Sequence, residues 1–183
     1  MFISVIFLII GMVTGYDESK CDPVDLPKAM KCLKNHQEVR QKAVTLDLDN
    51  DKNMIILNDT CIDFLKCSIP MKCGADETDS VNIDKAISYC HAVAFHVSDE
   101  YLKCANIVDT KNSTCVQGWN PFPEFDEKAE NLEELKREAC RSFFGKNGCL
   151  EGEISENCGV EMWKDFRKHY LALNDIIEAC DFG

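Results

Sequence analysis

Twelve cysteines in a chain of 183 residues constrain the fold more than any other feature of the sequence. Structural zinc sites use cysteine pairs two to four residues apart, and thioredoxin-like redox sites use C-x-x-C. No two cysteines here lie that close, so the spacing favours disulfides. We predict six disulfides and no metal, with the pairing left open. The cysteines are Cys21, Cys32, Cys61, Cys67, Cys73, Cys90, Cys104, Cys115, Cys140, Cys149, Cys158 and Cys180.

The segment CIDFLKCSIPMKC, residues 61–73, shows how this constraint acts locally. On a helix, Cys61 and Cys67 would lie about 9 Å apart along the axis and about 120° apart around it. They cannot pair with each other in that geometry, and Cys73 follows Pro70 on a further segment. We therefore expect the three sulfurs to bond to three different neighbours.

The first fifteen residues, MFISVIFLIIGMVTG, are apolar and uncharged. This run is too short for a membrane span and predicts a secretory signal peptide over residues 1–15, cleaved after Gly15. A buried N-terminal helix is the alternative. No later run is apolar over a spanning length, so we expect a secreted mature chain, 16–183, without a membrane span. Sequons at Asn58 and Asn112 predict N-glycosylation in the same export route.

The net charge of −12, from 32 acidic and 20 basic residues, limits the partners. Nucleic acids and anionic membranes attract basic surfaces, so both are disfavoured as partners. The acidity itself mainly favours solubility.

Apolar residues repeat at helical spacing over residues 26–33, 61–67, 81–108, 124–143 and 160–180. Ser98 is expected to restart the helix within 81–108, and a loop is expected over 45–59, with Asp59 or Thr60 capping the next helix. No stretch alternates strictly between apolar and polar residues. We predict an all-α fold, a single compact disulfide-rich domain with about five helices.

The loop WNPFP, residues 119–123, offers two interpretations. Trp119, Pro121, Phe122 and Pro123 either form an exposed recognition patch or a rigid plug whose rings pack between helices. We favour the plug, because exposed aromatic clusters are uncommon on soluble monomers.

Motifs for catalysis and metal binding are incomplete in this sequence. The acidic run DLDNDKN, 47–53, begins like a calcium-binding EF-hand loop but has Lys52 where glycine is needed and Asn58 where a bidentate acid is needed. His91 and His96 have the wrong spacing for one metal, and His36 and His169 stand alone, as partly exposed helix histidines often do. No G-x-S-x-G occurs. We therefore assign no catalytic residue, metal or cofactor.

The C-terminal half carries a recognisable combination of motifs. These are the W-x-P-F-P loop, the FFGK-x-x-C turn at 143–149, the segment C-G-x-x-x-W-x-x-F-R at 158–167 and the terminal CDF. In these, and in the number and spacing of its cysteines, the chain resembles the nematode twelve-cysteine extracellular domain, a family of unknown function. The resemblance implies an extracellular protein with six disulfides and transfers no catalytic residue.

These observations favour a secreted, glycosylated protein that acts by binding, through an unknown extracellular protein partner. The alternative is a carrier of a small apolar ligand or lipid in a cavity between helices. An enzyme is the third and least favoured possibility, because no set of residues combines an acid, a base and an oxyanion site.

Overall fold

A computed structural model describes residues 13, 15–48, 50–177 and 179–182. Most of the predicted signal peptide lies outside the described residues. The chain divides into two compact units, Met1–Val97 and Ser98–Gly183, which we call unit 1 and unit 2 and describe separately. The regular structure of the described residues is helical, with no strand, which confirms the all-α prediction. The helices are more numerous than the five or so expected.

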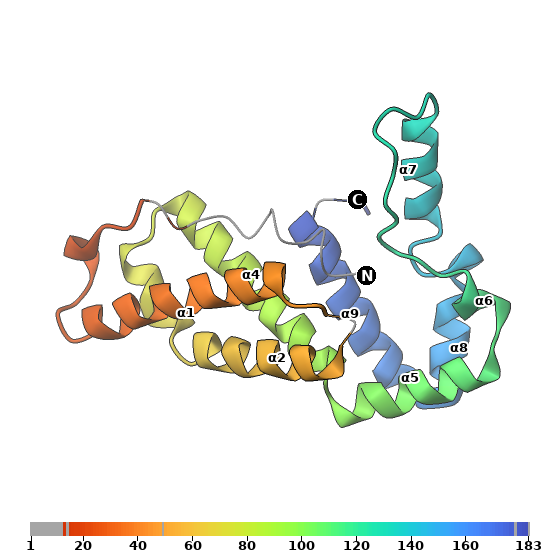
Figure 1. The fold of residues 1–183 in the computed structure, drawn as a ribbon, viewed down its shortest axis with the longest axis horizontal. Coiled ribbons are helices and arrows are strands. Elements are labelled where there is room, and N and C mark those ends of the chain that lie inside the picture. The colour runs from red at the N-terminus through yellow and green to blue at the C-terminus, as the bar shows by residue number, and fades with distance from the viewer. Residues whose placement is uncertain (1–12, 14, 49, 178, 183) are drawn as a thin grey trace. The chain divides into compact units, whose positions relative to one another are not determined.

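The described residues of unit 1 form three long helices and three short ones, drawn in red to green in Figure 1. They are η2 (Glu18–Lys20), α1 (Leu26–Thr45), α2 (Asp51–Leu65), α3 (Ser68–Met71), η3 (Lys72–Gly74) and α4 (Glu77–His96). Helix α1 packs against α2 and α3, and α2 also packs against α4. Helix α2 therefore lies at the centre of the unit.

Helix α2 begins earlier than the sequence predicts, so the expected loop over 45–59 is wrong for most of its length. The side chain of Asn50 accepts a hydrogen bond from the Lys52 N–H, which caps the helix there rather than at Asp59 or Thr60. Met54, Leu57 and Phe64 then face the core at helical spacing. The acidic run that suggested a loop precedes and enters the first turn, where carboxylates are favourable.

Three disulfides close unit 1, and each uses one cysteine of the 61–73 segment. Figure 1 shows the helices that they join. Cys61 bonds to Cys90 of α4, Cys67 to Cys32 of α1, and Cys73 to Cys21. The prediction that the three sulfurs have three separate partners is confirmed.

The described residues of unit 2 form four longer helices and two short ones, coloured green to blue in Figure 1. They are α5 (Asp99–Lys111), α6 (Thr114–Gln117), α7 (Leu132–Arg141), η4 (Lys146–Gly148), α8 (Cys149–Cys158) and α9 (Val160–Ile177). Helix α8 contacts α5, α6 and α9. Ser98 caps α5 through its side chain, so the predicted restart of the helix is confirmed. Helix α7 starts only at Leu132, because residues 124–131 form turns and irregular structure.

Unit 2 is closed by its own three disulfides. They are Cys104–Cys158, Cys115–Cys149 and Cys140–Cys180. No cysteine is free, which confirms the prediction of six disulfides. Since no disulfide joins the two units, each unit is cross-linked only within itself.

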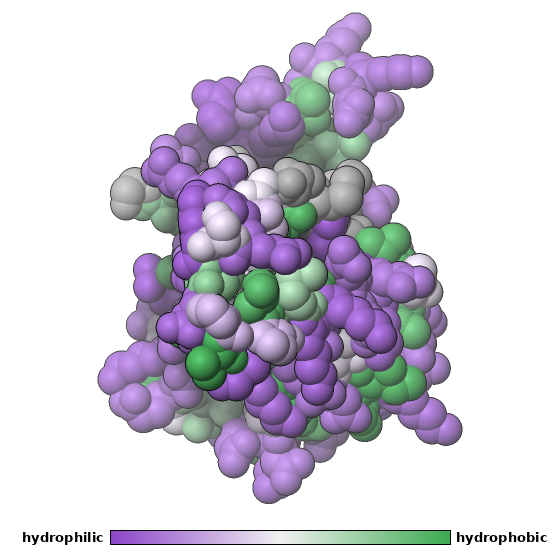
Figure 2. Space-filling model, turned by 90° about the vertical axis from the view of Figure 1, so that its left-hand side faces the viewer, coloured by the Kyte–Doolittle hydropathy of each residue, from purple (hydrophilic) through white to green (hydrophobic). Residues whose placement is uncertain are grey.

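The surface agrees with the acidic, polar composition. On the face shown in Figure 2, hydrophilic side chains cover most of the area and surround a small hydrophobic region. Among the described residues, the most exposed large apolar side chains are Val24 and Ile69, which are 74% and 71% exposed. None of the helices among the described residues is long and apolar enough to cross a membrane.

Replacing Gly74 by alanine is expected to destabilise unit 1 by about 1–3 kcal/mol. A Cβ there would lie 2.7 Å from ring atoms of Tyr16 and 2.8 Å from the carbonyl oxygen of Asp17, whose own N–H donates to the Gly74 carbonyl. Thermal unfolding followed by circular dichroism measures the change. As the matched control, Gly152→Ala in α8 meets no atom within 4 Å and should raise stability by about 0.5–1 kcal/mol. Equal effects of the two substitutions would contradict this packing.

Candidate functional site

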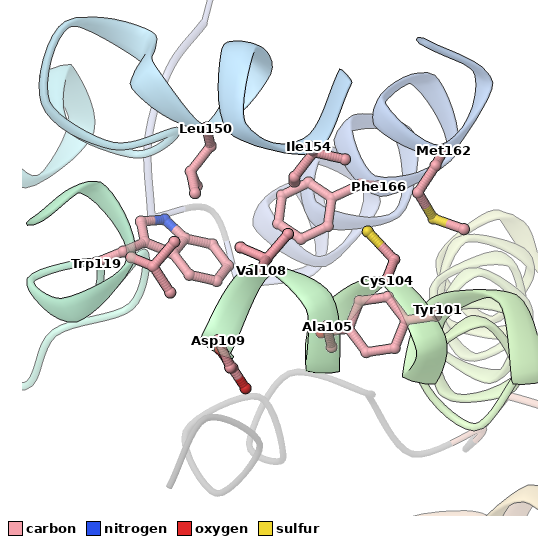
Figure 3. A pocket seen from close by; sticks show the side chains of 11 residues that line it. Tyr101, Cys104, Ala105, Val108, Asp109, Trp119, Leu150, Ile154, Met162 and Phe166 are labelled. Atoms are coloured by element: carbon pink, nitrogen blue, oxygen red, sulfur yellow. The ribbon is translucent and has the colours of Figure 1, made fainter. Parts of the chain in front are cut away.

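Unit 2 holds a small apolar pocket between α5, α8 and α9 (Figure 3). In Figure 3, Leu150 and Ile154 of α8 point toward Val108 of α5, and Trp119 closes one end. The lining residues are Tyr101, Cys104, Ala105, Val108, Asp109, Val116, Trp119, Leu150, Ile154, Met162 and Phe166. Residues of the 101–119 region and of the 150–166 region therefore meet around one cavity.

The pocket is suited to an apolar group. Its volume is about 70 Å³, roughly half of the ~150 Å³ cavity that accommodates benzene in another protein. Asp109 is the one carboxylate in the lining, and Figure 3 shows its side chain turned away from the pocket centre. Cys104 forms a disulfide with Cys158 and therefore offers no thiol to the pocket. The lining therefore offers mainly dispersion and hydrophobic contacts.

The WNPFP loop supplies the wall of this pocket through Trp119. The indole N–H donates to the carbonyl of Phe143 at 2.9 Å, and the ring lies 5.5 Å from Phe166 and 5.1 Å from Tyr170 between centroids. Phe122 makes an edge contact with Phe143 at 5.4 Å, and Pro121 is buried. Pro123 is half-buried. The rings of the loop pack on α9 and the 143–144 turn, with part of Trp119 facing the cavity.

Two tyrosines join the helices that line the pocket. Tyr101 of α5 and Tyr170 of α9 are joined by a hydrogen bond between their side chains. Burial raises the pKa of both phenols, so both remain neutral at physiological pH. This bond fixes α5 to α9, the two helices that contribute Val108 and Phe166 to the lining.

Unit 1 carries a polar groove between α1 and α2, formed by two adjoining hollows of about 280 and 260 Å³. Asn35 and Asp63 line both hollows, so we treat them as one α1–α2 groove. Its first hollow is also lined by Lys28, Lys31, Lys66, Cys67 and Pro70. Its second is also lined by Glu38, Lys42, Ile56, Asp59 and Thr60. The groove therefore has a basic end and a mixed polar end.

His36 is buried in the core of unit 1, against the expectation of partial exposure. It is 1% exposed, because it continues the buried stripe of α1 one turn after Cys32 and one turn before Val39. Its ring lies 5.5 Å from the ring of Phe64, and its Nε2 has no hydrogen-bond partner. Burial, and then the charge of Arg40, lower the pKa of His36 to about 4. His36 is therefore a neutral core residue.

The other residues singled out in the sequence do not meet in one site. Asn112 is exposed at the left-handed turn that ends α5, whereas Asn58 is half-buried within α2. His91 is exposed on α4 and His169 is half-buried on α9. In the described part of the chain, no three histidine, cysteine or acidic side chains group as metal ligands.

Sequence reasoning missed both the pocket and the groove. The pocket is lined by residues from α5, α8 and α9 that the sequence marks only as core. The groove depends on which flanks of α1 and α2 face each other. Lys28, Lys31 and Lys66 come together only when Cys32 is paired with Cys67. That pairing could not be read from the sequence.

The chain is similar to several proteins of a nematode. The profile of a family described as Domain of unknown function (DUF19) matches residues 21–181. UPF0376 protein F10G2.1 of Caenorhabditis elegans is 34% identical over 170 residues, which cover 90% of this chain and 83% of the relative. No solved structure matches the chain significantly.

Two further C. elegans proteins are similar along most of the chain. "Excretory canal abnormal exc-13" is 31% identical over 171 residues, covering 90% of this chain and 84% of that protein. UPF0376 protein C36C5.12 is 26% identical over 179 residues, covering 94% and 81%. These matches confirm the resemblance drawn from the cysteines and the C-terminal motifs, and their names describe no biochemical activity.

Proposed function

Since the chain belongs to the DUF19 family, which brings no known activity with it, we propose from its own residues that it is a secreted protein-interaction module that acts without catalysis. The observation that carries the proposal is the apolar pocket of unit 2. Interface hot spots commonly consist of an apolar anchor from one partner in a pocket of the other. The pocket is the feature of unit 2 best suited to accept such an anchor.

The size of the pocket indicates which side chain of a partner fits as the anchor. A cavity of about 70 Å³ is close to half of the volume that holds benzene, which corresponds to a branched group of three or four carbons. The end of a leucine or valine side chain has that size. Burying such a group contributes about 1.5–3 kcal/mol, which is typical of one anchor in a larger interface.

The acidic residues around the pocket indicate the charge of the surrounding partner surface. Asp109 belongs to the lining, and the acidic residues Glu151, Glu153 and Glu161 each neighbour a lining residue in the sequence. Glu151 and Glu161 are exposed. With a net charge of −12 on the whole chain, a partner with basic residues beside its apolar anchor is complementary.

Methyl NMR of the oxidised protein titrated with N-acetyl-leucinamide tests this proposal. We expect shifts at Ala105, Val108 and Ile154 with a dissociation constant in the range of roughly 10–100 mM, since one buried side chain gives only 1.5–3 kcal/mol. N-acetyl-glycinamide, which lacks the anchor, should leave these signals unchanged.

A variant and its control locate the binding. Ala105→Leu fills the cavity and should abolish the shifts, whereas Ala139→Leu on α7, a helix with no buried residue, should not affect them. Shifts that persist in Ala105→Leu, or that appear equally with N-acetyl-glycinamide, would rule out the pocket as an anchor site.

Secretion is supported by the disulfides. Six disulfides without a free thiol are characteristic of proteins that fold in an oxidising compartment. A signal peptide over residues 1–15 and glycans on the sequons belong to the same route. Recovery of the protein from the medium of expressing cells, with its N-terminus at Tyr16, would support this assignment, and retention in the cytosol would exclude it.

Of the two sequons, we expect Asn112 to carry the dominant glycan. Its side chain is exposed at the end of α5, next to Gln117, with which it shares a hydrogen bond. Asn58 lies inside α2 with its Oδ1 buried, so a glycan there would compete with packing of the helix. Mass spectrometry should show that Asn112→Gln removes the glycan mass and that Asn58→Gln leaves it unchanged. The reverse pattern would contradict this exposure argument.

A carrier of a small apolar ligand is the second candidate, and the apolar lining of the same pocket favours it. The volume argues against a lipid. The cavity is about half the size of one that holds benzene, and an acyl chain is larger than such a cavity. Native mass spectrometry of the secreted protein distinguishes the two functions. A co-purifying small apolar molecule would favour the carrier, and the bare protein mass would favour the interaction module.

A further inference from the structure

The basic end of the α1–α2 groove concentrates positive charge in a chain with a net charge of −12. Lys28 and Lys31 stand one turn apart on α1, and Lys66 follows the end of α2 on the opposite wall. Their side chains therefore line one hollow of about 280 Å³ from two sides. Convergent lysines around a hollow are suited to a ligand with a compact negative charge.

The lowered pKa of Asp63 reflects the positive potential at the basic end of the α1–α2 groove. Hydrogen bonding and attraction to Lys66, 3.0 Å away, lower the pKa of its carboxyl group, and Lys31 and Lys42 lower it further. One carboxylate stands against three lysines in the hollow, so the hollow keeps a positive balance. Lys28 is also only loosely paired, at 3.7 Å, with Asp25 outside it.

The walls of the groove are held together by covalent and hydrogen bonds. The Cys32–Cys67 disulfide links α1 to the segment after α2. The side-chain amide of Asn35 donates to the carbonyl of Asp63 at 3.1 Å and to the Cys67 sulfur at 3.6 Å. The backbone positions of the lysines are therefore fixed before any ligand binds, which reduces the entropic cost of binding.

The other end of the groove is rich in acceptors. Glu38 and Asp59 provide carboxylates, and the Thr60 hydroxyl accepts a hydrogen bond from the Lys42 ammonium at 2.7 Å. Ionised carboxylates accept hydrogen bonds from sugar hydroxyls, and a threonine hydroxyl can accept or donate one. The groove thus joins an anion-binding end to a hydroxyl-binding end.

We propose that the α1–α2 groove binds a saccharide that carries a sulfate or phosphate ester. The ester occupies the hollow between Lys28, Lys31 and Lys66, and the sugar hydroxyls face Glu38 and Asp59. Lysines act as point charges that can surround a tetrahedral oxyanion, whereas a planar carboxylate is better matched by arginine, which this hollow lacks. The proposal deepens the proposed binding function by adding a ligand class for unit 1.

Isothermal titration of the oxidised full chain at low salt, with N-acetylglucosamine 6-sulfate, N-acetylglucosamine 6-phosphate and N-acetylglucosamine, tests it. We expect both esters to bind at least about tenfold more tightly than the neutral sugar, since charged hydrogen bonds contribute about 1.5–3 kcal/mol. The relative affinities of the two esters identify the source of the anion. Inorganic sulfate should bind more weakly than the sulfated sugar, because it lacks the hydroxyl contacts.

Four variants separate the site from general charge effects. Lys31→Ala and Lys66→Ala should each weaken ester binding about tenfold, and Lys168→Ala, an exposed lysine of α9, should leave it unchanged. Asp63→Asn should strengthen binding, because it removes the opposing carboxylate from the hollow. A gain of affinity cannot arise from damage to the fold, so this variant keeps the test decisive.

The proposal is overturned if neutral N-acetylglucosamine binds as well as its esters, or if Lys168→Ala weakens binding as much as Lys31→Ala. It is also overturned if inorganic sulfate binds as tightly as the sulfated sugar, which would reduce the groove to a simple anion site. The pocket of unit 2 is tested with an uncharged probe, so failure here leaves that test independent.

Discussion

Replacing both Cys61 and Cys90 by alanine is expected to lower the stability of unit 1 by about 3–5 kcal/mol. Both cysteines are fully buried, and their bond closes a segment with a sequence separation of 29 between α2 and α4. Opening it frees the unfolded chain and leaves space in the core where the two buried sulfurs lay. A loss of this size is comparable to the whole stability of many small domains.

Hydrogen exchange of the α2 amides is the suitable measurement, because Trp119 and Trp163 both lie in unit 2 and tryptophan fluorescence does not report on unit 1. We expect the protection of α2 to fall by roughly two to four orders of magnitude, while the protection of α8 stays constant. The control is the Cys140/Cys180 pair of unit 2, whose replacement should spare α2. Full protection of α2 after loss of Cys61–Cys90 would contradict the packing described here.

The stability of unit 1 is expected to fall by about 3 kcal/mol as the pH is lowered from about 6.5 to about 4 because of His36. In the unfolded chain, His36 has a pKa near 6.5, whereas burial lowers its pKa in the folded chain to about 4. Between these values the unfolded state binds a proton that the folded state does not, so unfolding becomes more favourable as pH falls. Below about pH 4 this contribution stays lost.

Urea unfolding followed by circular dichroism across this pH range measures the effect. His36→Gln removes the titrating group and should flatten the pH dependence, even if it lowers stability at all pH values. His91→Gln provides the control, because His91 is exposed on α4 of the same unit. A pH dependence that survives in His36→Gln would assign it to other groups.

The helical architecture follows from local patterns that the sequence displays directly. Ser98 marks a helix start because its side chain can cap the next turn, and α5 begins there. The start of α2 was missed because Asn50, which caps it, lies within an acidic run that also suits a loop. Residues 124–131 have helical composition but form turns and irregular structure, and most of their side chains are exposed, so little packing is available to stabilise a helix there.

The binding sites depend on long-range pairing, which local patterns do not contain. Trp119 could be identified as structurally important from its loop, but its role as a pocket wall requires the position of α5 relative to α8. His36 shows the opposite error: its place between Cys32 and Val39 at helical spacing signalled a buried position. The structure buries His36 accordingly, against the expectation of partial exposure.

Disulfide mapping of the protein purified from culture medium, by non-reducing peptide digestion and mass spectrometry, tests the central claim most directly. The claim is that two helical units, each closed by its own disulfides, form fixed frames for the pocket and the groove. The expected bonds are Cys21–Cys73, Cys32–Cys67, Cys61–Cys90, Cys104–Cys158, Cys115–Cys149 and Cys140–Cys180. A peptide joining a cysteine of residues 21–90 to one of residues 104–180, or a free thiol, would contradict it.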